Sequence, residues 1–363
     1  MDPLLLVQYT VSGFMPLVCL SMLGAVFAYK KIFTKVTIDR ISASYSNFFN
    51  PVFVFFNVSS AIDINEISTI WPLFLTPSIV VILGTILAYI HSKICPKIPY
   101  LSKVVACILI FSNIGNMPVV LLKGICSPYG PLKSNSHCKD ANSYISLQVL
   151  TYNAIVWSYG SSLVSQDKTQ YLLSKQNEAI LESNPIAYQK TSFCRNILKN
   201  LLLPGPIACV IALLFGLIPG VHSTFFNKNS KLYCIVDAGF EVGLVGILLG
   251  QMTLGANLVL LSGSKLTLSK GFIGSIIFFK NILMPICGFC VVFGVFKAGI
   301  FGDNSVMAYC VFIAFCSPTA FIIMMITQIH DYGTKEVAWM MFWVYLCALP
   351  TLIAWTYVFF LII

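Results

Sequence analysis

The sequence predicts an all-α, polytopic membrane protein with ten transmembrane helices arranged as two inverted five-helix repeats. Three observations favour this class. Of the 363 residues, 58% are hydrophobic and only 10% are charged, whereas a soluble protein carries about a quarter charged residues. Long apolar runs recur between short polar connections. Finally, similar residues recur in the two halves of the chain at offsets of 198 to 200 positions.

Ten apolar runs are long enough to cross a bilayer. The first is too long for a signal peptide and has no basic segment before it, so we interpret it as a span. A polar connection at 165–197 separates a first repeat, 1–164, from a second, 198–363. No segment is left for a soluble catalytic or receptor domain. The expected spans are 4–28, 41–60, 70–91, 102–123, 142–164, 198–218, 234–262, 271–296, 306–329 and 337–361.

The basic residues predict the orientation. Of the 22 Lys and Arg residues, 15 lie in alternate connections, six lie on the opposite side and Lys280 lies within a span. Cytoplasmic loops carry the excess of Lys and Arg, so these connections are expected in the cytosol and both termini in the lumen or outside. This asymmetry accounts for the net charge of +9 without nucleic-acid binding. The basic connections are 29–40, 91–103, 164–200, 263–270 and 330–336.

Matching positions in the two halves indicate an internal duplication. Pro118 corresponds to Pro318, and Asn57 corresponds to Asn257. The stretch Ile-Val-Trp-Ser-Tyr at 155–159 likewise has a counterpart, Ile-Ala-Trp-Thr-Tyr, at 353–357. Because each half has five spans, an odd number, the second half would be inverted relative to the first.

The fourth and ninth spans contain residues that interrupt a helix. The fourth reads Asn113-Ile-Gly-Asn-Met-Pro118, and the ninth reads Cys316-Ser-Pro318. Proline removes a backbone donor and clashes with the carbonyl one turn earlier, so breaks are expected near Met117 and at Cys316–Ser317. A single interruption is often only a structural kink. Interruptions at corresponding places in two inverted halves favour a transporter binding site.

Each break would expose backbone groups in the middle of the bilayer, which is tolerable only beside a cavity. The helical segments that follow the breaks would each present a positive dipole end, so together they would attract a carboxylate. We expect Asn113, Asn116 and Ser317 to add donors, while Pro118 and Pro318 set the geometry. Further candidates for substrate binding are the paired residues Asn57 and Asn257, together with Gln148 and Gln328, because a lipid-facing glutamine is costly.

Three ionisable residues inside spans are candidates for coupling or gating. Asp237 and Glu241 lie one turn apart and share a helix face, although both could instead be solvated at the membrane interface. Lys280 could attract an anion or hold domains together, or it could extend to the cytosolic interface.

Most other features have simpler explanations. The 13 cysteines lie mostly in spans, where packing is their expected role. Cys126 and Cys138 bracket a non-cytosolic loop. The sequence leaves open whether these two cysteines form a disulfide or remain free thiols. The histidines are scattered, and no nucleotide-binding or hydrolase motif is present. We therefore expect no enzyme activity, no metal and no cofactor.

Several stretches along nearly the whole chain match the pattern of one known family: Phe49–Phe55, Ser59–Ile64, Gly115–Pro118, Cys126–Gly130 with Cys138, Ile155–Tyr159, Asp237–Gly239, Leu254–Leu258, Thr327–Gln328 and Trp339–Tyr345. Taken together, these stretches resemble the auxin efflux carrier superfamily, and its PIN-LIKES branch more closely than its PIN-FORMED branch. One departure is Ser317-Pro318-Thr319, where plant PIN-LIKES proteins tend to have a double proline.

The resemblance implies a fold like that of bile-acid symporters and the antiporter NhaA. Spans 1, 2, 6 and 7 would form a scaffold that commonly dimerises, and spans 3–5 and 8–10 a moving transport domain in which spans four and nine cross at their prolines. It also implies secondary transport of a small amphipathic organic anion such as auxin, indole-3-acetic acid, by an elevator mechanism. The endoplasmic reticulum is the favoured membrane and the plasma membrane the alternative. A sensor that binds the same ligand without turnover is the rival function.

Overall fold

The computed structural model describes residues 3–62, 67–96, 98–127, 130–132, 135–180, 193–227, 229–260 and 268–363. Within these ranges the regular structure is helical, and the single extended contact is an antiparallel bridge pair between Ser112 and Thr319. The predicted all-α class is therefore confirmed for this part of the chain.

Helices fill both halves of the chain. The first half contains α1 (Pro3–Tyr29), α2 (Lys35–Ser44), η1 (Tyr45–Phe49), α3 (Asn50–Ala61), α4 (Ile67–Ile94), α5 (Ser102–Ile110), α6 (Asn116–Ile125), η3 (Ser136–Asp140), α7 (Ala141–Ile155), η4 (Val156–Gly160) and α8 (Ser161–Ile180). The second half contains α9 (Phe193–Asn200), α10 (Pro204–Leu217), α11 (Pro219–Phe225), α12 (Tyr233–Leu260), α13 (Lys270–Ile277), η5 (Phe278–Leu283), α14 (Met284–Lys297), α15 (Ser305–Cys316), α16 (Ile322–Ile329) and α17 (Thr334–Ile362).

Several of these helices can cross a membrane. Among the described residues, five helical stretches are long and apolar enough by length and composition, and α9 with α10, bent by 55°, would make a sixth. The chain is therefore a polytopic membrane protein in architecture. The five stretches are Val7–Tyr29, Thr69–Ile94, Tyr233–Leu260, Lys270–Lys297 and Thr334–Ile362.

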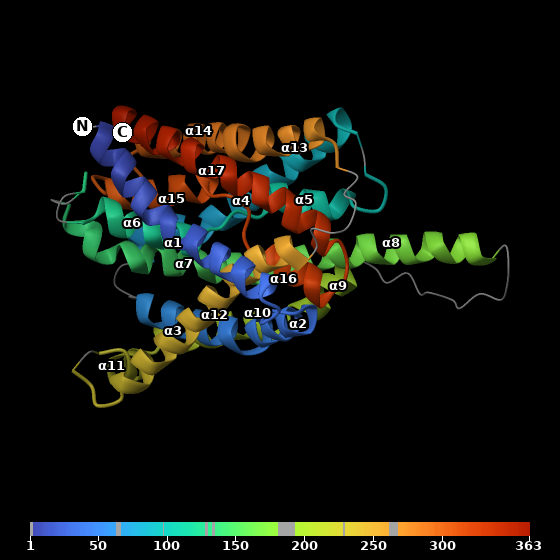
Figure 1. The fold of residues 1–363 in the computed structure, drawn as a ribbon. Helices are drawn as coiled ribbons and strands as arrows, with labels where there is room; N and C mark the ends of the chain where they lie inside the picture. Colours follow the sequence, from blue (N-terminus) through green and yellow to red (C-terminus); the bar gives the residue numbers. More distant parts are fainter. Residues whose placement is uncertain are drawn as a thin grey trace.

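The helices pack in two groups. In the first, α1 packs along α12, while α3 packs against α10 and α12. In the second, α4 packs against α5 and α7, α14 against α15, and α17 against α13 and η5. Figure 1 shows α3, α10 and α12 on one side of the bundle and α13, α14 and α17 on the other. The two groups meet where α1 contacts α6 and α17, where α3 contacts α7, and where α2 contacts α16.

The packing of α1 on α12 depends on glycine. A Cβ atom added to Gly24 would lie 1.9 Å from the carbonyl oxygen of Met252, and one added to Gly255 would lie 1.7 Å from that of Ser21. Small residues let two membrane helices approach to backbone contact. The sequence therefore makes α1 and α12 a closely packed pair.

The two ends of the bundle differ. Both termini lie at one end, and α8 extends beyond the body at the other (Figure 1). The fifth span is predicted to end at residue 164, before the polar connection 165–197, but the helix continues through η4 and α8 to Ile180. Ser161–Ile180 contains no Gly or Pro, so nothing in it stops the helix. Residues 181–192 lie outside the described part of the chain.

The break in the fourth span lies earlier than predicted. Residues 111–115 separate α5 from α6, so the break lies just before the predicted position near Met117, and Met117 itself is helical. Pro118 lies in the first turn of α6, where its missing N–H would have no intrahelical partner anyway. The break in the ninth span does follow Cys316, as expected, and α16 begins at Ile322.

Candidate functional site

The two breaks contact each other at the centre of the bundle. The backbone N–H of Asn113 donates to the carbonyl of Pro318 (2.7 Å), and that of Ala320 donates to the carbonyl of Phe111 (3.0 Å). These bonds satisfy backbone groups that lost their helical partners when the helices were interrupted. Residues about two hundred positions apart thus form one crossover.

Lys280 lies against this crossover. Its side chain is 1% exposed and comes from the π-helical segment η5, between α13 and α14. Its Nζ donates to the carbonyl of Leu109 (3.1 Å) and to Oγ of Ser112 (2.9 Å). Leu109 is in the last turn of α5, where the helix dipole favours a cation. Lys280 therefore does not extend to the membrane interface, and its ionisable amine lies buried at the crossover.

No acidic side chain pairs with this amine in the part of the chain that the structure describes, where the ion pairs within 4.0 Å are Lys35–Asp331 and His137–Asp140. A buried cation without a counter-ion is costly, and an anion beside it would recover much of that cost. The electrostatics of the crossover therefore favour an anionic ligand.

The ends of α5 and α15 at the crossover are capped by hydroxyl groups. Oγ1 of Thr319 donates to the carbonyl of Ile108 (2.8 Å), and Oγ of Ser317 donates to that of Ile313 (2.8 Å). Ser317 therefore bonds the last turn of its own helix. At the other end of α5, the buried carboxylate of Asp167 accepts from the backbone N–H groups of Lys103 (2.7 Å) and Val104 (2.9 Å).

Asn113 points toward α17. Its Nδ2 donates to the hydroxyl oxygen of Tyr345 (3.1 Å), and both side chains are buried. In the extended segment 111–115, Ser112 faces Lys280 while its neighbour Asn113 faces Tyr345. Pro118 is buried nearby in α6, and the side chain of Asn116 lies outside the described part of the structure.

The remaining predicted polar residues are more widely spread. Gln148 of α7 donates through Nε2 to the carbonyl of Cys310 in α15 (3.3 Å). Gln328 accepts a hydrogen bond from Ser42 of α2, and together with Asn257 it lines a cavity of about 320 Å³ at the end from which α8 projects. Asn57 and Asn257 each donate to a carbonyl of their own helix (both 2.8 Å).

Asp237 and Glu241 lie away from the crossover. Both are exposed on α12, beside exposed apolar residues such as Leu244 and Val245. Their shared face is therefore an outer surface of this chain and not part of the crossover.

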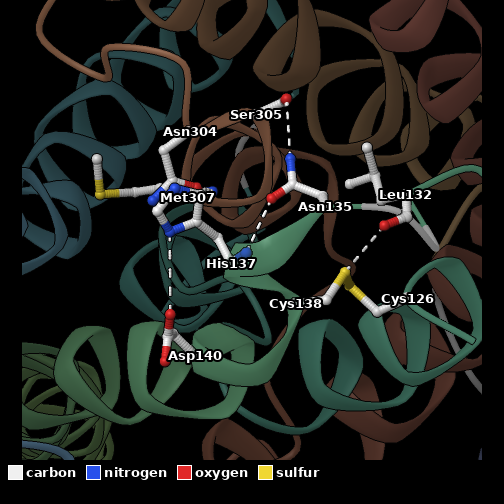
Figure 2. The surroundings of a disulfide bond; sticks show 9 residues. All are labelled: Cys126, Leu132, Asn135, His137, Cys138, Asp140, Asn304, Ser305 and Met307. Atoms are coloured by element: carbon white, nitrogen blue, oxygen red, sulfur yellow. Dashed lines mark hydrogen bonds and ion pairs between the residues drawn. A yellow bond between two sulfur atoms is a disulfide. The ribbon is translucent and has the colours of Figure 1, made fainter.

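A disulfide joins Cys126, at the end of α6, to Cys138 in η3 (Figure 2). In the loop it closes, Oδ1 of Asn135 accepts from the backbone of His137 (2.9 Å), and its Nδ2 donates to Oγ of Ser305 at the start of α15 (3.4 Å). The disulfide loop therefore connects the outer end of one broken span to the outer end of the other.

His330 lies at the opposite end, just after α16. Its Nε2 is 2.8 Å from Oγ of Ser161, and its carbonyl accepts from Nζ of Lys168 (2.7 Å). Burial, with a smaller effect of Lys168, lowers the pKa of His330 from 6.5 to about 4. His330 is therefore neutral at pH 7.

The depressed pKa of His330 predicts a pH-dependent stability. Between pH 6.5 and about 4 the unfolded chain binds a proton at this histidine that the folded chain does not, so stability falls as the pH falls through this range. Replacing it with glutamine (His330→Gln) should flatten the fall in the thermal unfolding midpoint across this range and leave the midpoint at pH 7.5 nearly unchanged. Parallel curves for the two proteins would contradict this prediction.

Ser112, Thr319 and Tyr345 were not among the binding-site residues predicted from the sequence. Ser112 and Thr319 are adjacent to predicted residues, so their position in the sequence could have identified them. Tyr345 lies in a long apolar span and gives no such signal.

Broken helices that meet inside a helical membrane bundle are characteristic of one class of membrane protein, the secondary transporters. A family model described as membrane transport protein matches residues 10–356. The chain therefore belongs to this family, which is the auxin efflux carrier family.

Its curated relatives are PIN-LIKES proteins of Arabidopsis thaliana. PIN-LIKES 5 is 23% identical and PIN-LIKES 7 is 24% identical, and each alignment covers 94% of this chain and 94% of the relative. PIN-LIKES 1 is 25% identical over 85% of this chain and 69% of its own length. The resemblance inferred from the sequence is confirmed.

Proposed function

We propose that this protein is a secondary carrier or uniporter for small amphipathic organic anions, such as indole-3-acetate and related carboxylates. The observation that carries the proposal is the crossover itself, where two broken helices meet beside the buried cation Lys280. The first N–H groups of α6 and α16 have no intrahelical partners, so both helix ends favour negative charge there. No ATP-binding motif supplies another source of energy.

Transport would follow an elevator-type alternating access mechanism. In this proposal ten spans form two inverted repeats, 1–164 and 198–363. The group α1, α3, α10 and α12 serves as the scaffold, and the group around the crossover moves against it. The close packing of α1 on α12 and of α3 on α10 supports treating these four helices as one unit.

Substrate would reach the crossover through the cavity lined by Asn257 and Gln328, which lies between α2, α12 and α16. The hydrogen bond from Ser42 to Gln328 and the exposed ion pair between Lys35 and Asp331 (3.3 Å) join the two groups at this cavity. Both contacts must break if the groups move apart.

We further propose an endoplasmic reticulum location with both termini in the lumen, and a homodimer through the scaffold helices. The disulfide loop supports this orientation, since disulfides persist in oxidising compartments. The exposed face with Asp237 and Glu241 supports dimerisation, because carboxylates facing lipid are costly.

Asn113 provides the direct test. Asn113→Leu keeps the side-chain volume but removes the donor at the crossover, so we expect exchange of indole-3-acetate to fall at least about tenfold. The measurement is counterflow of labelled indole-3-acetate in proteoliposomes. A carrier exchanges substrate across the membrane, whereas a sensor binds it without exchange.

Asn153→Leu is the matched control. Asn153 is equally buried, but it donates to the carbonyl of Val149 in its own helix (3.1 Å). We expect this variant to retain exchange. Full exchange by Asn113→Leu would exclude the crossover as the substrate site, and binding without counterflow by the unmodified protein would favour a sensor.

A further inference from the structure

A second cavity of about 380 Å³ lies at the depth of the crossover, between α1, α12 and α17. We call it the side pocket. Most of its lining is apolar, with Phe14, Leu254 and Leu349 among the lining residues. The lining residues Met15, Met22 and Leu346 are 43%, 64% and 56% exposed, so the pocket opens on the outer face of these membrane helices.

Two polar side chains of the side pocket have unused hydrogen-bonding capacity. Gln251 is 1% exposed, and its Nε2 donates to Oγ of Ser21 (2.9 Å) and to the carbonyl of Leu17 (3.4 Å). Its Oε1 has no hydrogen-bond partner among the residues that the structure describes. A buried acceptor left unpaired is costly, so this oxygen favours a ligand that brings an N–H or O–H group.

Tyr345 supplies the complementary group. Its hydroxyl oxygen accepts from Asn113, and the described residues supply no recorded acceptor for its own proton. Through its hydrogen bond with Asn113, Tyr345 also connects the side pocket to the crossover. The pocket thus offers a hydroxyl donor at the crossover side, an apolar body, and a buried acceptor on α12.

We infer that the side pocket binds the apolar ring system of the transported acid, and that Gln251 selects acids whose ring carries a hydrogen-bond donor. This inference rests on the proposed function. The carboxylate lies toward Asn113 and Tyr345, and a ring N–H donates to Oε1 of Gln251. An apolar pocket with a few placed polar groups is the usual form of such a site.

The experiment compares two acids of nearly equal shape, indole-3-acetate and benzothiophene-3-acetate, in which sulfur replaces the ring N–H. Competition with labelled indole-3-acetate for the purified full-length protein gives their relative affinities. We expect the unmodified protein to prefer the indole about tenfold, because sulfur leaves Gln251 unpaired. In Gln251→Leu the preference should fall to about one, with little loss of affinity for the thiophene acid. Gln8→Leu, on an exposed position of α1, should retain the preference.

Met22→Trp locates the pocket independently of Gln251. This exposed position tolerates a larger side chain, which would narrow the mouth of the side pocket. The affinities for both acids should therefore fall several-fold, and the ratio of the two affinities should stay unchanged. The inference is overturned if the unmodified protein does not distinguish the two acids, if Gln251→Leu keeps the preference, or if Met22→Trp binds both acids normally. If neither acid binds the unmodified protein, the proposed function fails, and this inference with it.

Discussion

Replacement of Lys280 by methionine is expected to abolish transport while leaving the fold intact. Methionine matches the length of the lysine side chain but removes its charge and its donors to Leu109 and Ser112. A substrate carboxylate at the crossover would then lose the counter-charge of Lys280, so we expect counterflow to fall at least about a hundredfold. The thermal unfolding midpoint should stay the same or rise, because a buried cation without a counter-ion is itself destabilising.

Two further variants complete the test of Lys280. Lys280→Arg keeps the charge but replaces a compact ammonium group with a larger, planar guanidinium group, so partial transport is expected. Lys297→Met makes the same change at an exposed position at the end of α14 and should transport normally. Undiminished counterflow by Lys280→Met would refute the role of this charge. A loss of transport that only parallels a loss of folded protein would show that Lys280 is structural.

Much of this architecture was accessible from the sequence. Uninterrupted apolar runs predict membrane helices, and the cluster of Asn113, Gly115 and Pro118 predicts an interruption in one of them. The fourth-span break lies slightly earlier than predicted because proline restricts both the residues before it and its own turn. Those restrictions allow it to begin a new helix as readily as to end the old one.

The side-chain directions at the site could not be predicted. Nearly every residue of α15 is buried, and α1 and α12 are apolar around most of their circumference, so no periodicity assigns their faces. The same ambiguity left Lys280 open between the interface and the interior. Only packing between distant segments shows that Lys280 faces α5 and that Tyr345 meets Asn113.

The second large effect is expected from Gly255→Ala. An alanine Cβ there would lie 1.7 Å from the carbonyl oxygen of Ser21, and a backbone atom cannot move aside as a flexible side chain can. Helices α1 and α12 would have to separate, at a cost of about 3 kcal/mol or more. We expect a large fall in the thermal unfolding midpoint of the purified protein, and loss of ligand binding with it, since α1 and α12 form one wall of the side pocket.

Gly294→Ala is the matched control. Gly294 lies inside α14, and an added Cβ would meet nothing within 4 Å among the described residues. Because glycine costs about 0.5–1 kcal/mol relative to alanine within a helix, this variant should be as stable as the unmodified protein or slightly more stable. If the thermal unfolding midpoint falls in Gly255→Ala and stays or rises in Gly294→Ala, backbone contact between α1 and α12 makes these two helices one rigid unit. Equal midpoints for the two variants would instead mean that these helices can move apart, and a scaffold that yields in this way could not support an elevator.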